Sequence, residues 1–84
     1  MIPPHLLQQL RNTPVRELIG ALEQDGSIHR RLRGSGRVYR HPDGRRVVIH
    51  YHHSGDTLPI GTLRNVLRGA HWTVVDLRRL DLIL

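Results

Sequence analysis

Residues 33–46 read RGSGRVYRHPDGRR, and this stretch predicts the centre of the fold. The Gly-Ser-Gly run around Ser35 is typical of a turn, and residues 37–41 then return as a short strand. Residues 41–44 (HPDG) have proline in the second position and glycine in the fourth, which suits a type I turn. Two turns this close together predict consecutive antiparallel strands joined by hairpins.

Three strands are expected around these turns. Residues 27–33 alternate weakly, so that Ile28 and Leu32 lie on one side of the first strand. The other side is basic, and we expect it to face solvent or a ligand. It carries His29, Arg31 and Arg33. In the second strand Val38 and Tyr39 point to opposite faces of the sheet. The β-branched run at 47–49 forms the third strand. The sequence therefore predicts a three-stranded antiparallel meander.

Two amphipathic helices are expected before and after the meander. Thr13 is a good N-cap, Pro14 suits the first helical position, and apolar residues recur at i, i+3, i+4 and i+7 from Val15. These signals predict a helix over residues 14–25, which Gly26 ends. After a loop rich in turn-forming residues, the same spacing predicts a second helix. Its apolar residues are Leu63, Val66, Leu67 and Ala70.

The two ends of the chain give weaker signals. Residues 1–12 are expected to be an N-terminal extension, in which Leu6, Leu7 and Leu10 can line one face of a helical turn. A single domain then covers residues 13–84. Thr73 and Asp76 resemble a capping box with Asp in place of the usual Glu, and they predict a short C-terminal helix. The apolar tail at 81–84 is expected to pack on the domain or on another chain.

This order of elements predicts an α+β fold: a helix, a three-stranded antiparallel sheet and a helix, with both helices covering one face of the sheet. The chain has 84 residues, which allows one domain with a small core. A domain of this size leaves little room for a large internal active-site cavity.

The charge of the chain favours a polyanionic partner. There are 13 basic residues, all of them arginine, against 7 acidic ones, which gives a net charge of +6. Arginine makes bidentate contacts with phosphate and stacks on bases. The alternative is an arginine-rich but ordinary solvated surface.

Cysteine is absent from the sequence, which excludes disulfides, thiolate metal sites and a cysteine nucleophile. The N-terminus lacks the features of a signal peptide, and no apolar run approaches the ~20 residues that span a bilayer. These observations predict a cytoplasmic protein without membrane contact.

Four motifs in this order resemble the HicA family of small RNA-cleaving toxins, over roughly residues 13–80. They are the glycine turn, residues 39–44 (YRHPDG), residues 53–55 (HSG) and residues 58–68 (LPIGTLRNVLR). The resemblance implies a fold like that of the double-stranded-RNA-binding domain, mRNA as substrate, and cleavage without metal or cofactor. It also implies a HicB-like antitoxin that neutralises the toxin by covering its basic face, and through which an oligomer can assemble.

The catalytic position departs from the family pattern. In the HicA family the glycine turn usually reads Gly-Ser-His, and that histidine is catalytic, whereas this chain has Gly36 there. A positioned general base contributes typically 10²–10⁴-fold, so we expect impaired cleavage. His53 occupies a position where the family often carries histidine and is the candidate substitute. Its alternative roles are to stabilise the loop or to contact a phosphate. His29 and His41 are not expected beside Gly36.

The predicted RNA contacts flank the glycine turn. They are Arg31, Arg33, Ser35, Arg37, Tyr39 and Arg40. Tyr39 would stack on a base, or else pack in the sheet. Arg64 and Arg68, spaced i, i+4 on the second helix, extend the basic face or engage an acidic partner.

The histidines around residue 51 leave a metal site open as an alternative. His50 and His52 point to the same face of a strand, and Asp56 is the only nearby carboxylate. Metal sites generally need three or four protein ligands, so we predict a polar strand end and no metal. A non-catalytic RNA-binding adaptor and a structural domain with incidental charge remain alternative functions.

Overall fold

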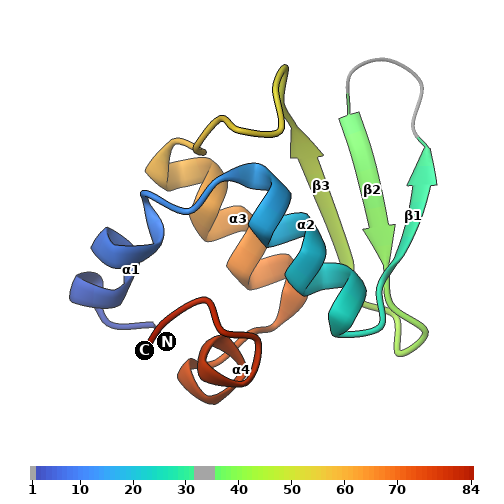
Figure 1. The fold of residues 1–84 in the computed structure, drawn as a ribbon. Helices are drawn as coiled ribbons and strands as arrows, with labels where there is room; N and C mark the ends of the chain where they lie inside the picture. The colour runs from blue at the N-terminus through green and yellow to red at the C-terminus, as the bar shows by residue number, and fades with distance from the viewer. Residues whose placement is uncertain (1, 32–35) are drawn as a thin grey trace.

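The computed structural model describes residues 2–31 and 36–84. It contains a three-stranded antiparallel sheet in the order β1 (Ile28–Arg31), β2 (Gly36–Arg40) and β3 (Arg46–His50). Two helices, α2 (Val15–Gln24) and α3 (Ile60–Ala70), lie against one face of the sheet (Figure 1). The predicted α+β architecture and the meander are therefore confirmed.

Helix α2 ends as the sequence predicts but begins differently. At its C-terminus Gly26 has φ +104°, and the bonds Gly26 N–H to Glu23 O and Ser27 N–H to Leu22 O form a Schellman motif. At its N-terminus the N-cap is Pro14, and no side chain caps the helix. The first amide groups instead donate to carbonyls of a distant loop: Val15 N–H to Asp56 O at 2.8 Å and Arg16 N–H to Ser54 O at 2.9 Å. The predicted Thr13 cap is wrong because a tertiary contact already satisfies these donors.

The register of the sheet fixes which residues share a face. Tyr39 pairs with Val47, and both side chains belong to the hydrophobic core beneath the helices. Side chains alternate along a strand, so the neighbouring positions face away from the helices. We call this second surface the open face. Its residues are Ile28, Arg30, Gly36, Val38, Arg40, Arg46, Val48 and His50.

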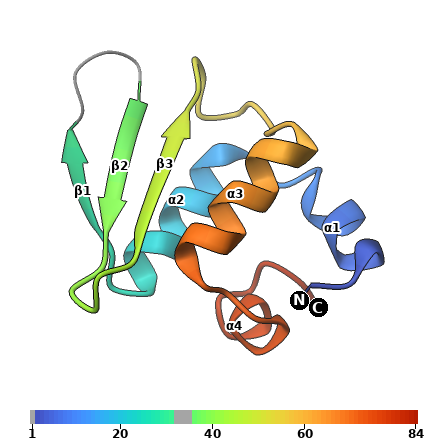
Figure 2. The same ribbon diagram turned by 180° about the vertical axis from the view of Figure 1, so that it is seen from behind.

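Two further helices complete the fold, one beyond α3 on the side away from the sheet and one below the C-terminal end of α3 (Figure 2). Helix α1 (Pro4–Leu10) buries Leu7 and Leu10 in the same core as α2 and α3. Helix α4 (Val74–Arg79) begins with the predicted capping box, in which Thr73 and Asp76 bond reciprocally. The tail also packs on the domain, since Ile83 is buried.

Gly69 allows α3 to approach β3 closely. A Cβ at this position would lie 2.6 Å from the backbone oxygen of Arg46 and 3.3 Å from a methyl group of Val47. Gly20 in α2 is the opposite case, because a Cβ there would have no other heavy atom within 4 Å. Helical glycines in this fold are thus either required by packing or free to be replaced.

Gly69→Ala is therefore expected to lower the free energy of unfolding, although alanine is the better helix former by about 1 kcal/mol. The added methyl group forces α3 away from a backbone atom that cannot yield. Gly20→Ala is the matched control and is expected to gain about 1 kcal/mol. Urea unfolding of both variants checks this, and equal stabilisation by the two substitutions would contradict the close packing of α3 on β3.

Candidate functional site

The open face of the sheet is basic. Cross-strand neighbours form two rows, one of Ile28, Arg40 and Arg46 and one of Arg30, Val38 and Val48. Arg30, Arg40 and Arg46 are exposed. None of the chain's seven Asp and Glu residues lies in a strand. This face therefore presents positive charge around a small apolar centre.

The orientation of β1 differs from the sequence prediction. Ile28 was expected to face inward, yet it lies on the open face and is 53% exposed. His29, on the other side, lies over buried Tyr39 with the ring centroids 5.2 Å apart. The register with β2 decides the matter, because Ile28 pairs with exposed Arg40 and His29 with Tyr39. The alternation of apolar and polar residues in a four-residue strand is too short to predict its orientation, which follows from its pairing with β2.

Gly36 and His50 are direct cross-strand partners at the end of the open face. A Cβ built on Gly36 would lie 2.7 Å from Cε1 of His50 and 3.2 Å from each of its ring nitrogens. The imidazole of His50 therefore occupies the space that a side chain at position 36 would need. The sequence predicted His50 only as a polar strand end or metal ligand, and its place over Gly36 was missed.

The predicted RNA contacts do not form one surface. Arg40 is on the open face, whereas Arg37 points to the opposite side, where its Cζ lies 5.0 Å from the ring centroid of Tyr51. Tyr39 is 3% exposed and belongs to the core, so it cannot stack on a base in this conformation. Burial also raises the pKa of Tyr39. The remaining contacts cannot be placed, because Arg33 and Ser35 lie outside the described residues and Arg31 is described only by its backbone pairing with Arg37.

His53 belongs to the loop that covers the N-terminus of α2. Its N–H donates to Oδ2 of Asp56 at 3.1 Å, and the Asp56 N–H donates to the His53 carbonyl at 3.0 Å. These bonds form a closed turn over residues 53–56. The carbonyls of Ser54 and Asp56, both in this turn, accept the first two amides of α2. The loop geometry supports the turn-stabilising role that the sequence offered for this residue.

The same loop contains Asp56, the carboxylate of the alternative metal site. The carboxylate of Asp56 accepts the His53 amide and is part of the turn. Across residues 2–31 and 36–84, no group of three or more His, Asp or Glu side chains could hold a metal ion.

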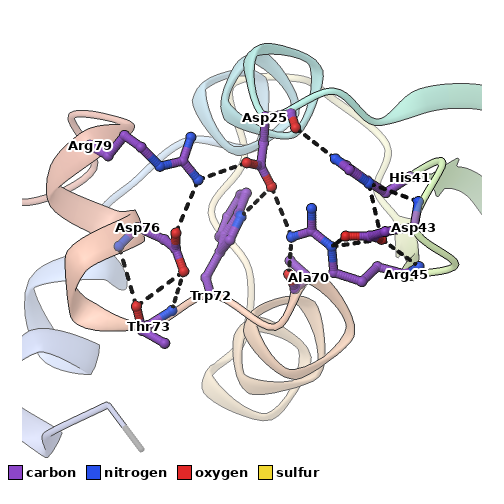
Figure 3. Close-up of polar contacts among 9 residues, drawn as sticks. All are labelled: Asp25, His41, Asp43, Arg45, Ala70, Trp72, Thr73, Asp76 and Arg79. Carbon is purple, nitrogen blue, oxygen red and sulfur yellow. Dashed lines mark hydrogen bonds and ion pairs between the residues drawn. The ribbon is translucent and has the colours of Figure 1, made fainter.

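Arg45 is held inside the fold by the carboxylate of Asp25, at the C-cap of α2 (Figure 3). Asp25 accepts hydrogen bonds from Arg45 Nη1 at 3.0 Å, Trp72 Nε1 at 3.0 Å and Arg79 Nη2 at 2.7 Å. Arg45 Nη1 also donates to the Ala70 carbonyl at 2.6 Å. This Asp25 cluster ties α2, the β2–β3 turn, the end of α3 and α4 together. Arg45 is thus unavailable to a ligand.

His41 fastens the β2–β3 turn to the same place. Its Nε2 lies 2.9 Å from the Asp25 carbonyl oxygen, and its Nδ1 accepts the Asp43 N–H at 3.1 Å. The same Nδ1 lies 3.0 Å from Oδ1 of Asp43. Gly44 N–H donates to the His41 carbonyl at 2.9 Å and closes the predicted β-turn. The HPDGR stretch is thus structural at His41, Asp43 and Arg45, as Figure 3 shows.

Arg64 and Arg68 do not extend the open face. They line a groove between α1 and α3, on the helical side of the molecule, together with Ile2, Pro4, Leu7, Leu67 and Trp72. Contact of Arg64 and Arg68 with an acidic partner remains a prediction.

A meander with its two main helices on one face and a basic open face defines a small domain with the fold of double-stranded-RNA-binding domains. The model of the HicA toxin family of bacterial toxin–antitoxin systems matches residues 15–72, well over half of the chain. The chain therefore belongs to the HicA toxin family. No curated protein matches it. In the part of the chain that the structure describes, no helix is long and apolar enough to cross a membrane.

Proposed function

We propose that this chain is the toxin of a toxin–antitoxin pair that binds mRNA on its open face and cleaves it more slowly than relatives with histidine at the position of Gly36. The observation that carries the proposal is the placement of Arg30, Arg40 and Arg46 on one exposed sheet face without any carboxylate in the strands. Exposed arginines on a face with no carboxylate in its strands are available for contacts with phosphates.

The family also supports an antitoxin partner. We propose a HicB-like protein that is acidic where it covers the open face and so blocks RNA by occlusion. The exposed Ile28 beside Arg40 and Arg46 gives such a partner an apolar contact within a basic surface. We also propose the cytoplasm as the site of action, because mRNA is there.

The test removes charge from one face at a time. The open-face variant carries Arg30→Gln, Arg40→Gln and Arg46→Gln. The matched control removes the same charge from the helical side with Arg11→Gln, Arg64→Gln and Arg68→Gln. Binding of a labelled single-stranded mRNA transcript is then measured between 50 and 200 mM salt.

The open-face variant is expected to bind more weakly, and its slope of log K against log salt should be shallower by about 2, since each phosphate contact with a single strand contributes about 0.7. The control should keep the slope nearly unchanged. An equal change in both variants would mean that only net charge matters, and absence of RNA binding at low salt would refute the proposed function. Binding without cleavage by any form would instead favour the RNA-binding adaptor.

A further inference from the structure

His50 takes the space above Gly36 because of the register of the β2–β3 hairpin. Directly opposed residues of antiparallel strands have their side chains on the same face, about 4.5–5.5 Å apart at Cβ. Glycine has no side chain to oppose its partner, so the His50 ring lies across the Gly36 backbone with its Cε1 2.7 Å from the position of an absent Cβ. The catalytic position that lacks a side chain is thus covered by an imidazole from the next strand.

The surroundings of His50 suit proton transfer. The residue is exposed. It shares the open face with Arg30, Arg40 and Arg46, so a phosphate held by these cations would lie on the same side of the sheet. Imidazole is the side chain that exchanges protons most readily near neutral pH.

We propose that His50 is the general base for RNA cleavage in this chain and takes the role of the histidine that is missing at position 36. This inference rests on the proposed function, because it requires RNA on the open face. An unprotonated ring nitrogen of His50 takes the proton of a ribose 2′-hydroxyl, and the 2′-oxygen attacks the adjacent phosphorus. The bond from phosphorus to the 5′-oxygen breaks, and that oxygen leaves with the electron pair and takes a proton from water. The products are a 2′,3′-cyclic phosphate and a 5′-hydroxyl, and the imidazolium returns its proton to solvent.

A purely structural role for His50 predicts a different outcome. A ring that only covers a glycine stabilises the hairpin, and its loss lowers the melting temperature without a specific effect on cleavage. The experiment therefore measures RNA binding, melting temperature and cleavage together. The probe is a labelled single-stranded RNA transcript, and the same sequence as DNA, which has no 2′-hydroxyl, should stay intact.

His50→Gln is expected to lose about 10²-fold or more of the cleavage rate, in line with a general base, and to bind RNA as the unaltered chain does. The matched control is His52→Gln, which removes an exposed histidine just after β3 and should cleave normally. His50→Gly should recover cleavage when free imidazole is added, without a change in melting temperature.

The possible failures are distinguishable. RNA that is bound but not cleaved by the unaltered chain overturns the inference and leaves RNA binding intact, as does cleavage that survives in His50→Gln. Loss of cleavage in His53→Gln but not in His50→Gln would move the base to the loop residue. If no form binds RNA, the proposed function itself fails, and the inference fails with it.

Discussion

Gly36→His combined with His50→Gly is expected to cleave RNA about 10²–10⁴-fold faster than His50→Gly alone. The family resemblance puts a catalytic histidine at position 36, and the structure puts another imidazole in the space it needs, 2.7 Å from its Cβ. Removing His50 opens that space. The exchanged pair would therefore present one histidine on the open face, at the position that the family resemblance implies.

The single variant Gly36→His should gain less than the exchanged pair. Its new side chain must displace the His50 ring, and the two imidazoles then compete for one position. Initial cleavage rates of all four forms, measured on the same labelled transcript, give a double-mutant cycle that we expect to be non-additive. Gly36→Gln with His50→Gly serves as the control, because it fills the space without supplying a base. A rate no higher in Gly36→His with His50→Gly than in this control would contradict a catalytic role for position 36.

The contact between His50 and Gly36 depends on the register of the hairpin, which the predicted turn alone does not give. A four-residue turn over 41–44 has its centre between Pro42 and Asp43, and counting outward from it would pair Gly36 with Ile49. In the structure the His41 N–H also donates to the Arg45 carbonyl and Gly44 has φ +102°, so the hairpin is centred on Asp43 and Gly36 pairs with His50. The family resemblance pointed to His53 as the substitute histidine, and neither signal indicated His50.

Elements with strong local signals were predicted correctly. The apolar stripe of α2, its glycine stop and the Thr73–Asp76 capping box all depend on residues within a few positions of one another. The side of β1 that faces the helices was not predictable in this way, because it follows from pairing with Tyr39 rather than from its own four residues.

Long-range polar contacts escaped prediction for the same reason. Arg45 lies in a stretch dense in arginine, so the sequence suggested only basic surface. Its partners Asp25 and Ala70 are 20 and 25 residues away, and no local pattern connects them. The division of the chain at residue 12 stays a prediction, although Leu10 of α1 is buried in the same core as α2.

Asp25→Asn is expected to lower the free energy of unfolding by about 2 kcal/mol or more, because the buried donors of Arg45 and Trp72 lose their charged acceptor. Arg45 keeps its contact with Asp43, and Arg79 keeps its contact with Asp76. The Asp25 side chain is 7% exposed and that of Arg45 is 18% exposed. An asparagine keeps the size of the side chain but cannot balance two guanidinium groups. For a domain whose total stability is about 5–15 kcal/mol, this is a large loss, and urea unfolding at neutral pH measures it.

Asp43→Asn is the matched control for this substitution. Asp43 also binds Arg45, with Arg45 Nε 2.8 Å from Oδ2, but its side chain is 50% exposed. Water screens such a pair, so the loss of stability should be much smaller than at Asp25. Equal losses at the two positions would contradict the structural importance of the Asp25 cluster.

The pH dependence of the Asp25→Asn effect follows from the pKa of the carboxyl. Burial alone raises the pKa of Asp25, but the hydrogen bonds from Trp72, Arg79 and Arg45 outweigh it and hold the pKa below its ordinary value of 3.8. A lowered pKa in the folded state contributes stability that is present above pH 3.8 and is lost as the pH falls through the folded value.

The stability difference between the unaltered chain and Asp25→Asn should therefore be constant near neutrality and shrink below about pH 3.8. Arginine bonds also lower the pKa of Asp43 and, after the Thr73 amide, that of Asp76, so both proteins still weaken in acid. A difference that stayed constant down to pH 2 would contradict a contribution from the charge of Asp25.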